Sequence, residues 1–251
     1  MVRVAALALL GLSFTFALAK DDYTLGPDSQ PQPGTPQGET QTFKLESKIF
    51  DGTVRDVGIY IPKQYDPSKP AAFMVFQDGM SYMNPKGSYR VPVVFDNLIH
   101  KKQIPVMVGI FVNPGSFAGK DAKKGGSNRS FEYDTLSPQY AKFLEEEVLP
   151  EVSKKVKLTT DPALRGIGGA SSGGICAFTV AWERPDLFTK VLSHIGSYAN
   201  IRGGDRYPGI IRKTPNKPLR IFLQDGSNDV NNEHGDWWLS NLQMESALKY
   251  K

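Results

Sequence analysis

The chain has 251 residues, of which 40% are apolar and 22% are charged, with 24 Gly, 18 Pro and a single Cys. This composition is typical of a globular domain, and it excludes a disulfide-stapled scaffold, a collagen-like repeat and a mostly disordered chain. The formal net charge of +4 is small and the Lys residues are scattered, so we expect no basic face of the kind that binds nucleic acid.

Residues 1–19 have the pattern of a secretory signal peptide. A single Arg3 precedes an apolar run that ends in Ala17-Leu18-Ala19, a small-residue cleavage site. The run is shorter than the roughly 20 residues that a membrane-spanning helix requires. We therefore expect a cleaved signal, a secreted or periplasmic protein and no stable membrane anchor. Residues 20–41 are rich in Pro, Gly and Gln and are expected to form an extended linker, which leaves residues 42–251 as the folded domain.

The domain is expected to begin with an antiparallel hairpin. Two β-rich runs, residues 41–50 and 53–61, flank Asp51-Gly52, a strong hairpin signal. Continuous apolar runs then predict strands that are covered on both faces, as in a parallel sheet, and helical spacing appears between them. The further expected strands are residues 71–76, 105–112, 164–168, 191–194 and 219–224, and the expected helices are residues 93–102, 137–155, 174–182 and 237–250, with Pro150 bending or ending the second helix.

Strands that alternate with helices predict an α/β fold with a mostly parallel sheet and flanking helices. Ligands of such sheets bind outside the carboxyl ends of the strands. The loops of interest are therefore residues 78–90, 113–132, 169–173, 196–218 and 225–236.

One of these loops carries the pattern G-x-S-x-G, as Gly169-Ala170-Ser171-Ser172-Gly173, between a predicted strand and a predicted helix. A sharp turn in this position would expose the hydroxyl of Ser171 as a nucleophile. The backbone N–H of Ser172, at the start of the helix, could then stabilise an oxyanion. A phosphate-binding loop would require Gly-Lys-Ser/Thr, and a dinucleotide-binding loop would require Gly in place of Ser171.

The other parts of an acyl-transfer site have candidates at other strand ends. The N–H of Gly79 or Met80, after the strand that ends at Phe76, could be the second oxyanion donor. Either Asp225 or Asp229, in the first turn after a later strand, could orient a catalytic His.

The combination of motifs resembles the putative esterase family, which contains enterochelin, feruloyl, acetyl-xylan and esterase D type enzymes. The resemblance rests on the segment 169–174, the stretch 129–134 with the helix 143–150 that follows, and Gly226-Ser227-Asn228-Asp229. It implies the α/β-hydrolase fold, Ser171 as the nucleophile, Asp229 as the acid with Asp225 as the lesser candidate, and no metal or organic cofactor. Arg129 and Glu132 match the family's Arg-x-x-Glu, and we interpret them as a structural ion pair.

The base departs from the family pattern. The family places its catalytic His about 30 residues beyond the acid, and no His follows His234 in this sequence. The last strand, the His loop and the final helix are therefore expected to be missing, and the activity of the chain impaired. His100 is expected at the surface, His194 in a partly buried structural position, and His234 in contact with substrate or in a structural role.

We therefore expect a secreted serine esterase, represented by a C-terminally truncated sequence, that acts on a sugar, phenolic or siderophore-type ester. The expected partner is a small-molecule or carbohydrate-linked ester, with Tyr82 and Trp237 as aromatic contacts beside His234. These aromatics could equally be packing residues. The alternative is a secreted binding module that keeps the pocket with an incomplete triad. The sequence leaves the oligomeric state open.

Overall fold

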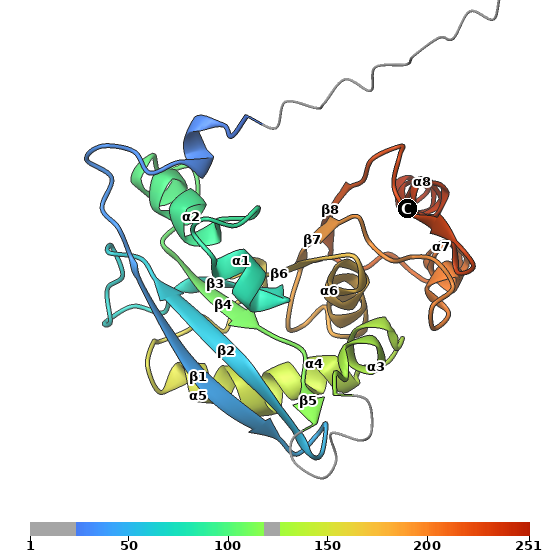
Figure 1. The fold of residues 1–251 in the computed structure, drawn as a ribbon, viewed down its shortest axis with the longest axis horizontal. Coiled ribbons are helices and arrows are strands. Elements are labelled where there is room, and N and C mark those ends of the chain that lie inside the picture. Colours follow the sequence, from blue (N-terminus) through green and yellow to red (C-terminus); the bar gives the residue numbers. More distant parts are fainter. Residues whose placement is uncertain (1–23, 118–125) are drawn as a thin grey trace, which may run out of the picture.

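In the computed structural model, which describes residues 24–117 and 126–251, a mixed sheet crosses the centre of the molecule (Figure 1). The strands follow the order β1-β2-β4-β3-β6-β7-β8, and β5 pairs with the start of β2. The expected signal peptide, residues 1–19, lies outside the described residues. The strands are β1 (Glu39–Ser47), β2 (Thr53–Ile61), β3 (Ala72–Gln77), β4 (Met107–Val112), β5 (Ser116–Phe117), β6 (Arg165–Ala170), β7 (Lys190–His194) and β8 (Arg220–Gln224), with a separate short ribbon of β9 (Asn231–Asn232) and β10 (Gly235–Asp236).

The predicted hairpin is confirmed, although its loop is longer than the two expected residues. β1 and β2 pair antiparallel from Glu39 opposite Ile61 to Ser47 opposite Thr53. Residues 48–52 leave the ladder because the Glu147 carboxylate accepts hydrogen bonds from Ser47 Oγ and from the backbone N–H groups of residues 48 and 49, at 2.6–3.0 Å. A side chain distant in sequence therefore determines where the strand ends.

The parallel part of the sheet is also confirmed. The pairs β4–β3, β3–β6, β6–β7 and β7–β8 are all parallel. The apolar runs of β3, β4 and β6 are buried on both faces, with Phe73, Val75, Ile110 and Ile167 each 0% exposed, whereas the edge strand β8 leaves Phe222 57% exposed. The carboxyl ends of β3, β6, β7 and β8 therefore lie at the same edge of the sheet.

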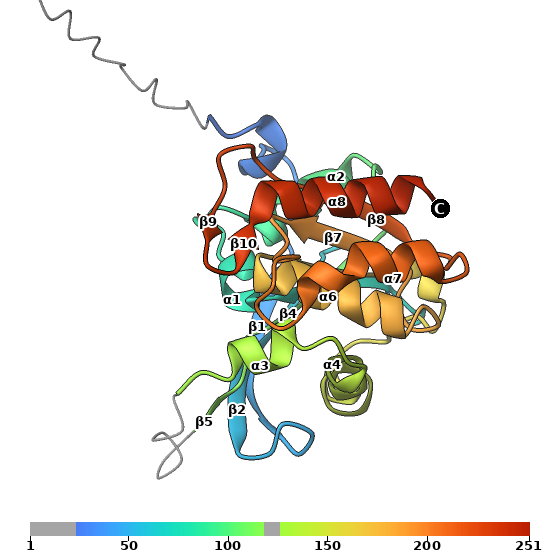
Figure 2. The same cartoon turned by 90° about the vertical axis from the view of Figure 1, so that its right-hand side faces the viewer.

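Helices cover both faces of the sheet (Figures 1 and 2). On one face α1 and α2 enclose an aromatic cluster that includes Phe76, Phe95 and Phe111. On the other face α6 is central, with the remaining helices around a second cluster that includes Phe143 and Phe178. The bounds are α1 (Gly79–Met83), α2 (Val91–His100), α3 (Arg129–Asp134), α4 (Gln139–Phe143), α5 (Leu149–Ser153), α6 (Ser172–Glu183), α7 (Tyr207–Lys213) and α8 (Trp237–Lys249).

The long helix predicted at residues 137–155 contains one turn of π-helix. Residues Leu144–Val148 join α4 to α5, and Pro150 is the second residue of α5. Proline has no N–H to donate to the preceding turn, and a π-type turn accommodates this loss without ending the helix. The expected effect of Pro150 therefore takes the form of a local change in hydrogen bonding.

The segment before β1 contacts the domain. The amide of Asn97 on α2 donates hydrogen bonds to the carbonyls of Asp28 and Gln30, at 3.0 and 2.8 Å. The N–H of Gly38 donates to Asp96 Oδ1 at 2.8 Å. Residues 28–38, which fall in the expected linker, therefore lie along α2, because two buried polar side chains of that helix bind their backbone.

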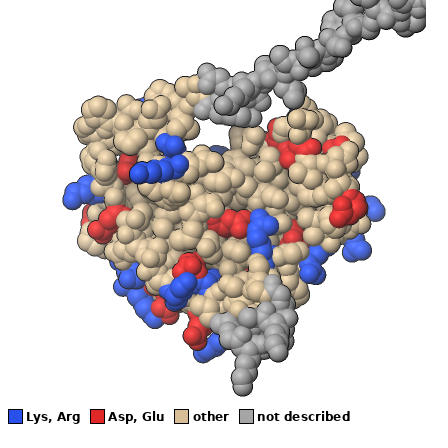
Figure 3. Space-filling model, in the orientation of Figure 1, with Lys and Arg blue, Asp and Glu red and all other residues tan. Residues whose placement is uncertain are grey.

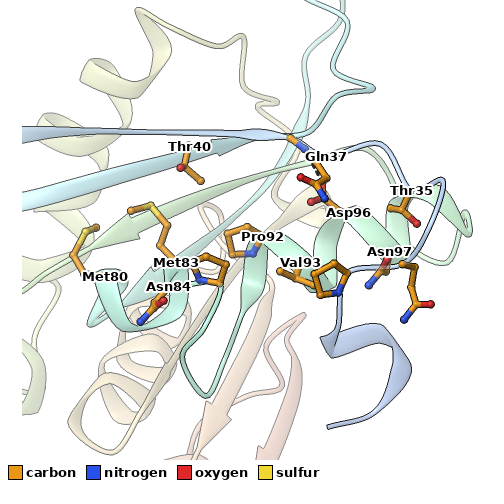
Figure 4. A pocket seen from close by; sticks show the side chains of 14 residues that line it. Thr35, Gln37, Thr40, Met80, Met83, Asn84, Pro92, Val93, Asp96 and Asn97 are labelled. Carbon is orange, nitrogen blue, oxygen red and sulfur yellow. Dashed lines mark hydrogen bonds between the residues drawn. The ribbon is translucent and has the colours of Figure 1, made fainter.

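This segment forms one wall of a cavity of about 540 Å³ (Figure 4). Met80 and Met83 of α1 lie at one end of the cavity, and Thr35, Asp96 and Asn97 lie at the other. Elsewhere on the surface, Figure 3 shows acidic and basic side chains interspersed over the face seen in Figure 1. Within the described ranges, every helix is too short or too polar to span a membrane.

Candidate active site

Ser171 occupies the sharp turn between β6 and α6. Its backbone dihedrals are φ 56° and ψ −122°, a conformation that is unfavourable for a residue with a side chain. The turn also brings two glycines together, because a Cβ atom added to Gly169 would lie 2.4 Å from the carbonyl oxygen of Gly173. The local geometry that the motif predicts, with small residues on either side of a strained serine, is therefore present.

Two further strained residues lie at neighbouring strand ends. Asp78 follows β3 with φ 52°, and Ile195 follows β7 with φ 43°. Positive φ values are rare outside glycine, and such strain clusters at functional sites, where the surrounding structure maintains it. β3, β6 and β7 are adjacent in the sheet, so three of the five non-glycine residues with positive φ in the described chain lie at the strand ends around Ser171, the other two being Arg90 and Lys102.

The hydroxyl of Ser171 has a serine partner. Ser171 Oγ lies 3.0 Å from Ser197 Oγ, and Ser197 also receives a hydrogen bond from the indole N–H of Trp237 at 3.1 Å. Ser197 lies in the loop after β7, and its own N–H donates to the carbonyl of Ser171 at 3.1 Å. Nothing in the local sequence marks Ser197, because its contact with Ser171 depends on the pairing of β6 with β7.

The expected oxyanion donors lie at two helix starts. Ser172 is the first residue of α6, and Gly79 is the first residue of α1. A Cβ atom on Gly79 would lie 2.2 Å from backbone atoms of Phe111 and Val112, so α1 can start against β4 only with glycine in this position. The N–H of Met80 already donates to Asn113 Oδ1 at 3.1 Å. Of the two alternatives from the sequence, Gly79 therefore fits an oxyanion donor better.

The two candidate acids lie close together after β8. Burial, with a further contribution from the neighbouring Asp229 carboxyl, raises the pKa of Asp225 to about 6. One oxygen of Asp225 accepts from the N–H of Gly226, and one oxygen of Asp229 accepts from the N–H of Val230, both at 2.7 Å. The structure thus places both carboxyls in one turn, with β7 between their strand and that of Ser171.

This carboxyl pair predicts a pH-dependent stability. The folded-state pKa of Asp225 lies above the ordinary value of 3.8, so the folded state binds more protons between about pH 4 and pH 6, and stability falls as the pH rises through this window. Asp225→Asn should remove this loss and raise the melting temperature at pH 7 by about 2–4 °C, corresponding to about 1 kcal/mol, since solvent screens a partly exposed carboxyl. Asp229→Asn should also weaken the dependence. Calorimetry from pH 4 to pH 7 tests this, and an equally steep fall in Asp225→Asn would contradict it.

The expected ion pair between Arg129 and Glu132 is wrong. Glu132 instead pairs with the buried Arg55 of β2 at 2.5 Å, and Arg129 pairs with Asp78 through two hydrogen bonds of 2.9 and 2.8 Å. The two side chains leave α3 in different directions, because one reaches β2 and the other reaches the loop after β3. Each pair therefore connects α3 to a different part of the sheet.

Asp134, at the end of α3, is a further acidic residue near the nucleophile; it ends the stretch 129–134, but the motifs assign it no role. It is only 2% exposed. Burial raises the pKa of Asp134, and the hydroxyls of Ser172 and Ser130 oppose this effect. The residue after the nucleophile therefore has a buried carboxyl beside its side chain.

The aromatic and imidazole candidates differ in their surroundings. Tyr82 is only 1% exposed and stacks on Phe76 and Tyr89, with ring centroids 5.0 and 3.9 Å apart. A buried ring of this kind does not fit the expected stacking on a substrate. His194 is half-buried, as expected, and its Nδ1 lies 3.2 Å from the hydroxyl of Tyr82. Burial lowers the pKa of His194.

The remaining candidates lie in and after the acid turn. His234 is exposed, with its ring 3.9 Å from the Glu233 carboxylate. Trp237 is 6% exposed and contacts Ser197 through its N–H. His100 ends α2 at the surface. In the part of the chain that the structure describes, no hydrogen bond joins any of the three His rings to Ser171 or Asp229, and no cluster of three His, Cys, Asp or Glu side chains could hold a metal ion.

The chain is similar to known proteins in both sequence and fold. A family model described as Putative esterase matches residues 47–250. The structure is similar to an enterobactin esterase from Shigella flexneri, with 21% identity, 88% of this chain and 54% of that chain covered, and a TM-score of 0.65. The ferric enterobactin esterase from Salmonella typhimurium is 19% identical over 91% of this chain and 53% of that chain, with a TM-score of 0.66. A ferulic acid esterase is 18% identical over 85% of this chain and 86% of that chain, with a TM-score of 0.63.

These similarities confirm the expected α/β-hydrolase fold with its mainly parallel sheet. The chain spans about half the length of the two enterobactin esterases. At identities of 18–21%, the similarity to these solved structures shows the fold alone.

Proposed function

Since this chain belongs to the Putative esterase family, we propose that it hydrolyses carboxylic esters through an acyl-enzyme on Ser171. The observation that carries the proposal is the turn at Ser171, where a serine with φ 56° lies at the start of α6 between two closely approaching glycines. A hydroxyl held in this way projects from the sheet edge toward a substrate. The similarity to enterobactin and ferulic acid esterases supports a sugar, phenolic or siderophore-type ester as the substrate.

The proposed reaction has two steps. Ser171 Oγ attacks the ester carbonyl, its proton goes to a base, and the alcohol leaves with a proton, so that the acyl group is bound to Ser171. Water then attacks the acyl-enzyme, releases the carboxylic acid and restores the Ser171 hydroxyl. The N–H groups of Ser172 and Gly79, at the starts of α6 and α1, stabilise the negative oxygen that forms in both steps.

The acid and the base are part of the same proposal. Asp229, with Asp225 beside it, orients an imidazole that removes the proton of Ser171. In the described structure His194 contacts Tyr82 and His234 lies beside Glu233. We therefore propose that the chain reacts slowly by itself and that added imidazole accelerates the reaction, because a hydroxyl without a base is a weak nucleophile. From the expected signal peptide we also propose that the protein is secreted or periplasmic.

Covalent labelling tests this proposal. An alkyl fluorophosphonate, applied with and without 50 mM imidazole, is expected to modify Ser171, as identified by mass spectrometry of the digested protein. Ser171→Ala should lose the label, whereas Ser153→Ala, an exposed serine at the end of α5, should keep it. Ser153→Ala should also release nitrophenol from p-nitrophenyl acetate as the wild type does. Ser171→Ala should release only what imidazole hydrolyses directly, and it therefore serves as the blank. Label on another residue, or none, would overturn the proposal and favour a binding module.

A further inference from the structure

The hydrogen bond between the hydroxyls of Ser171 and Ser197 has a defined direction. Ser197 Oγ lies between Ser171 Oγ, at 3.0 Å, and the indole N–H of Trp237, at 3.1 Å. We propose that Ser197 is a catalytic residue whose hydroxyl donates a hydrogen bond to Ser171 Oγ, and that Trp237 is the positioning residue that imposes this direction. The inference rests on the proposed function, since it assigns a role at the same nucleophile.

The direction follows from counting donors and acceptors. An indole N–H can only donate, so it occupies one lone pair of Ser197 Oγ, whereas a hydroxyl has a single proton to give. Ser197 is 1% exposed, and among the described residues Ser171 Oγ is the acceptor within reach of that proton. If Ser171 donated instead, the Ser197 proton would be buried without an acceptor, which is unfavourable. The chain of donors therefore runs from Trp237 to Ser197 to Ser171.

The loop that carries Ser197 is held firmly in this position. The N–H of Ser197 donates to the carbonyl of Ser171. The side-chain amide of Asn241 on α8 donates to the carbonyls of Gly196 and Trp237, at 2.9 and 3.0 Å. A Cβ atom on Gly196 would lie 2.4 Å from the ring of Tyr198. Because α8 holds both the indole and the loop, the spacing of the two hydroxyls is preorganised.

This direction has a consequence for the reaction. Since Ser171 Oγ accepts from Ser197, its own proton points away from Ser197 and toward the open side of the site, where a base removes it. The negative charge that develops on Oγ during attack, and again when Oγ leaves in deacylation, receives a hydrogen bond that strengthens as the charge grows. No bond to Ser197 forms or breaks in either step.

The test measures fluorophosphonate labelling of Ser171 over a range of reagent concentrations at about pH 7 in imidazole buffer, which separates the maximal labelling rate from the affinity for the reagent. Ser197→Ala is expected to lower the maximal rate about tenfold, the effect of one hydrogen bond to a charged group, and to leave the affinity unchanged, because the donor acts on the charge that develops on Ser171 Oγ. Trp237→Phe keeps the aromatic packing and removes the N–H, so it should slow labelling by a smaller factor. Trp238→Phe is the matched control and should leave the rate unchanged, because Trp238 is on the same helix, α8, and is not among the described hydrogen-bond partners of Ser171 or Ser197.

The outcomes separate this inference from the proposed function. If Ser171 of the wild type is labelled but Ser197→Ala and Trp237→Phe have the wild-type maximal rate, the inference is overturned and the proposed function stands. Label on Ser197 itself would also overturn the inference. If the wild type is not labelled at Ser171, both are overturned. Melting temperatures identify a folding defect in Ser197→Ala, and in that case the maximal rate and the reagent affinity of Trp237→Phe decide.

Discussion

Arg55→Leu is expected to lower the free energy of unfolding by about 3–5 kcal/mol, because it leaves a buried carboxylate without its cation. The side chains of Arg55 and Glu132 are both 0% exposed and contact at 2.5 Å. The guanidinium also donates to Thr53 and lies 4.2 Å from the centre of the Phe143 ring. After the substitution Glu132 retains the hydrogen bonds from Gly115 and Asn128, which do not neutralise its charge. Chemical denaturation at pH 7 measures the effect.

Two comparisons distinguish the loss of the buried pair from a general effect of losing charge. Lys44→Ala breaks an ion pair with Asp56 whose side chains are 69% and 39% exposed, and it should cost at most about 1 kcal/mol. The double variant Arg55→Leu with Glu132→Leu removes both charges, so it should recover much of the stability lost in the single variant. A single variant within 1 kcal/mol of the wild type would show that the pair does not hold α3 on β2.

The main elements of the fold could be predicted because their signals are local. The apolar side chains of Phe73–Phe76 and around Ile110 can all be buried only in strands that are covered on both faces. The amphipathic spacing near Phe143 likewise required a helix. In contrast, α1, α3 and α7 have five, six and seven residues. Helices this short have too few turns for a periodic pattern, and packing stabilises them rather than their own sequence.

The same distinction between local signals and long-range contacts applies to the candidate site. The turn at Ser171 was predictable, since all the residues that it requires lie between Gly169 and Gly173. The contacts that surround the turn join residues far apart in sequence, since Ser197 bonds Ser171, 26 positions away, and Trp237, 40 positions away. The prediction for Arg129 failed for this reason. Residues three apart on a helix are neighbours, but a buried Arg on β2 competes for the same carboxylate.

Gly169→Ala is expected to disrupt both the turn at Ser171 and the stability of the fold. The new methyl group would lie 2.4 Å from the carbonyl oxygen of Gly173 and 2.5 Å from its carbon, which are backbone atoms in the first turn of α6. Because backbone cannot rotate away as a side chain does, α6 must move relative to β6, at a cost of about 3 kcal/mol. A shift of the helix also displaces Ser171 and the N–H of Ser172 from each other. We therefore expect the labelling rate of Ser171 to fall about 10²-fold.

Gly166→Ala is the matched control for this effect, since it makes the same substitution in the same strand. A Cβ atom on Gly166 would have the side chain of Met74 as its nearest neighbour, at 3.3 Å, and a flexible Met side chain can adjust to an added methyl group. We expect this variant to remain within about 1 kcal/mol of the wild type and to label at a similar rate. If both variants lost the same stability and reactivity, a general intolerance of β6 to larger residues would explain the result. If Gly169→Ala were labelled at the wild-type rate, the close approach of Gly169 and Gly173 would not be what positions Ser171.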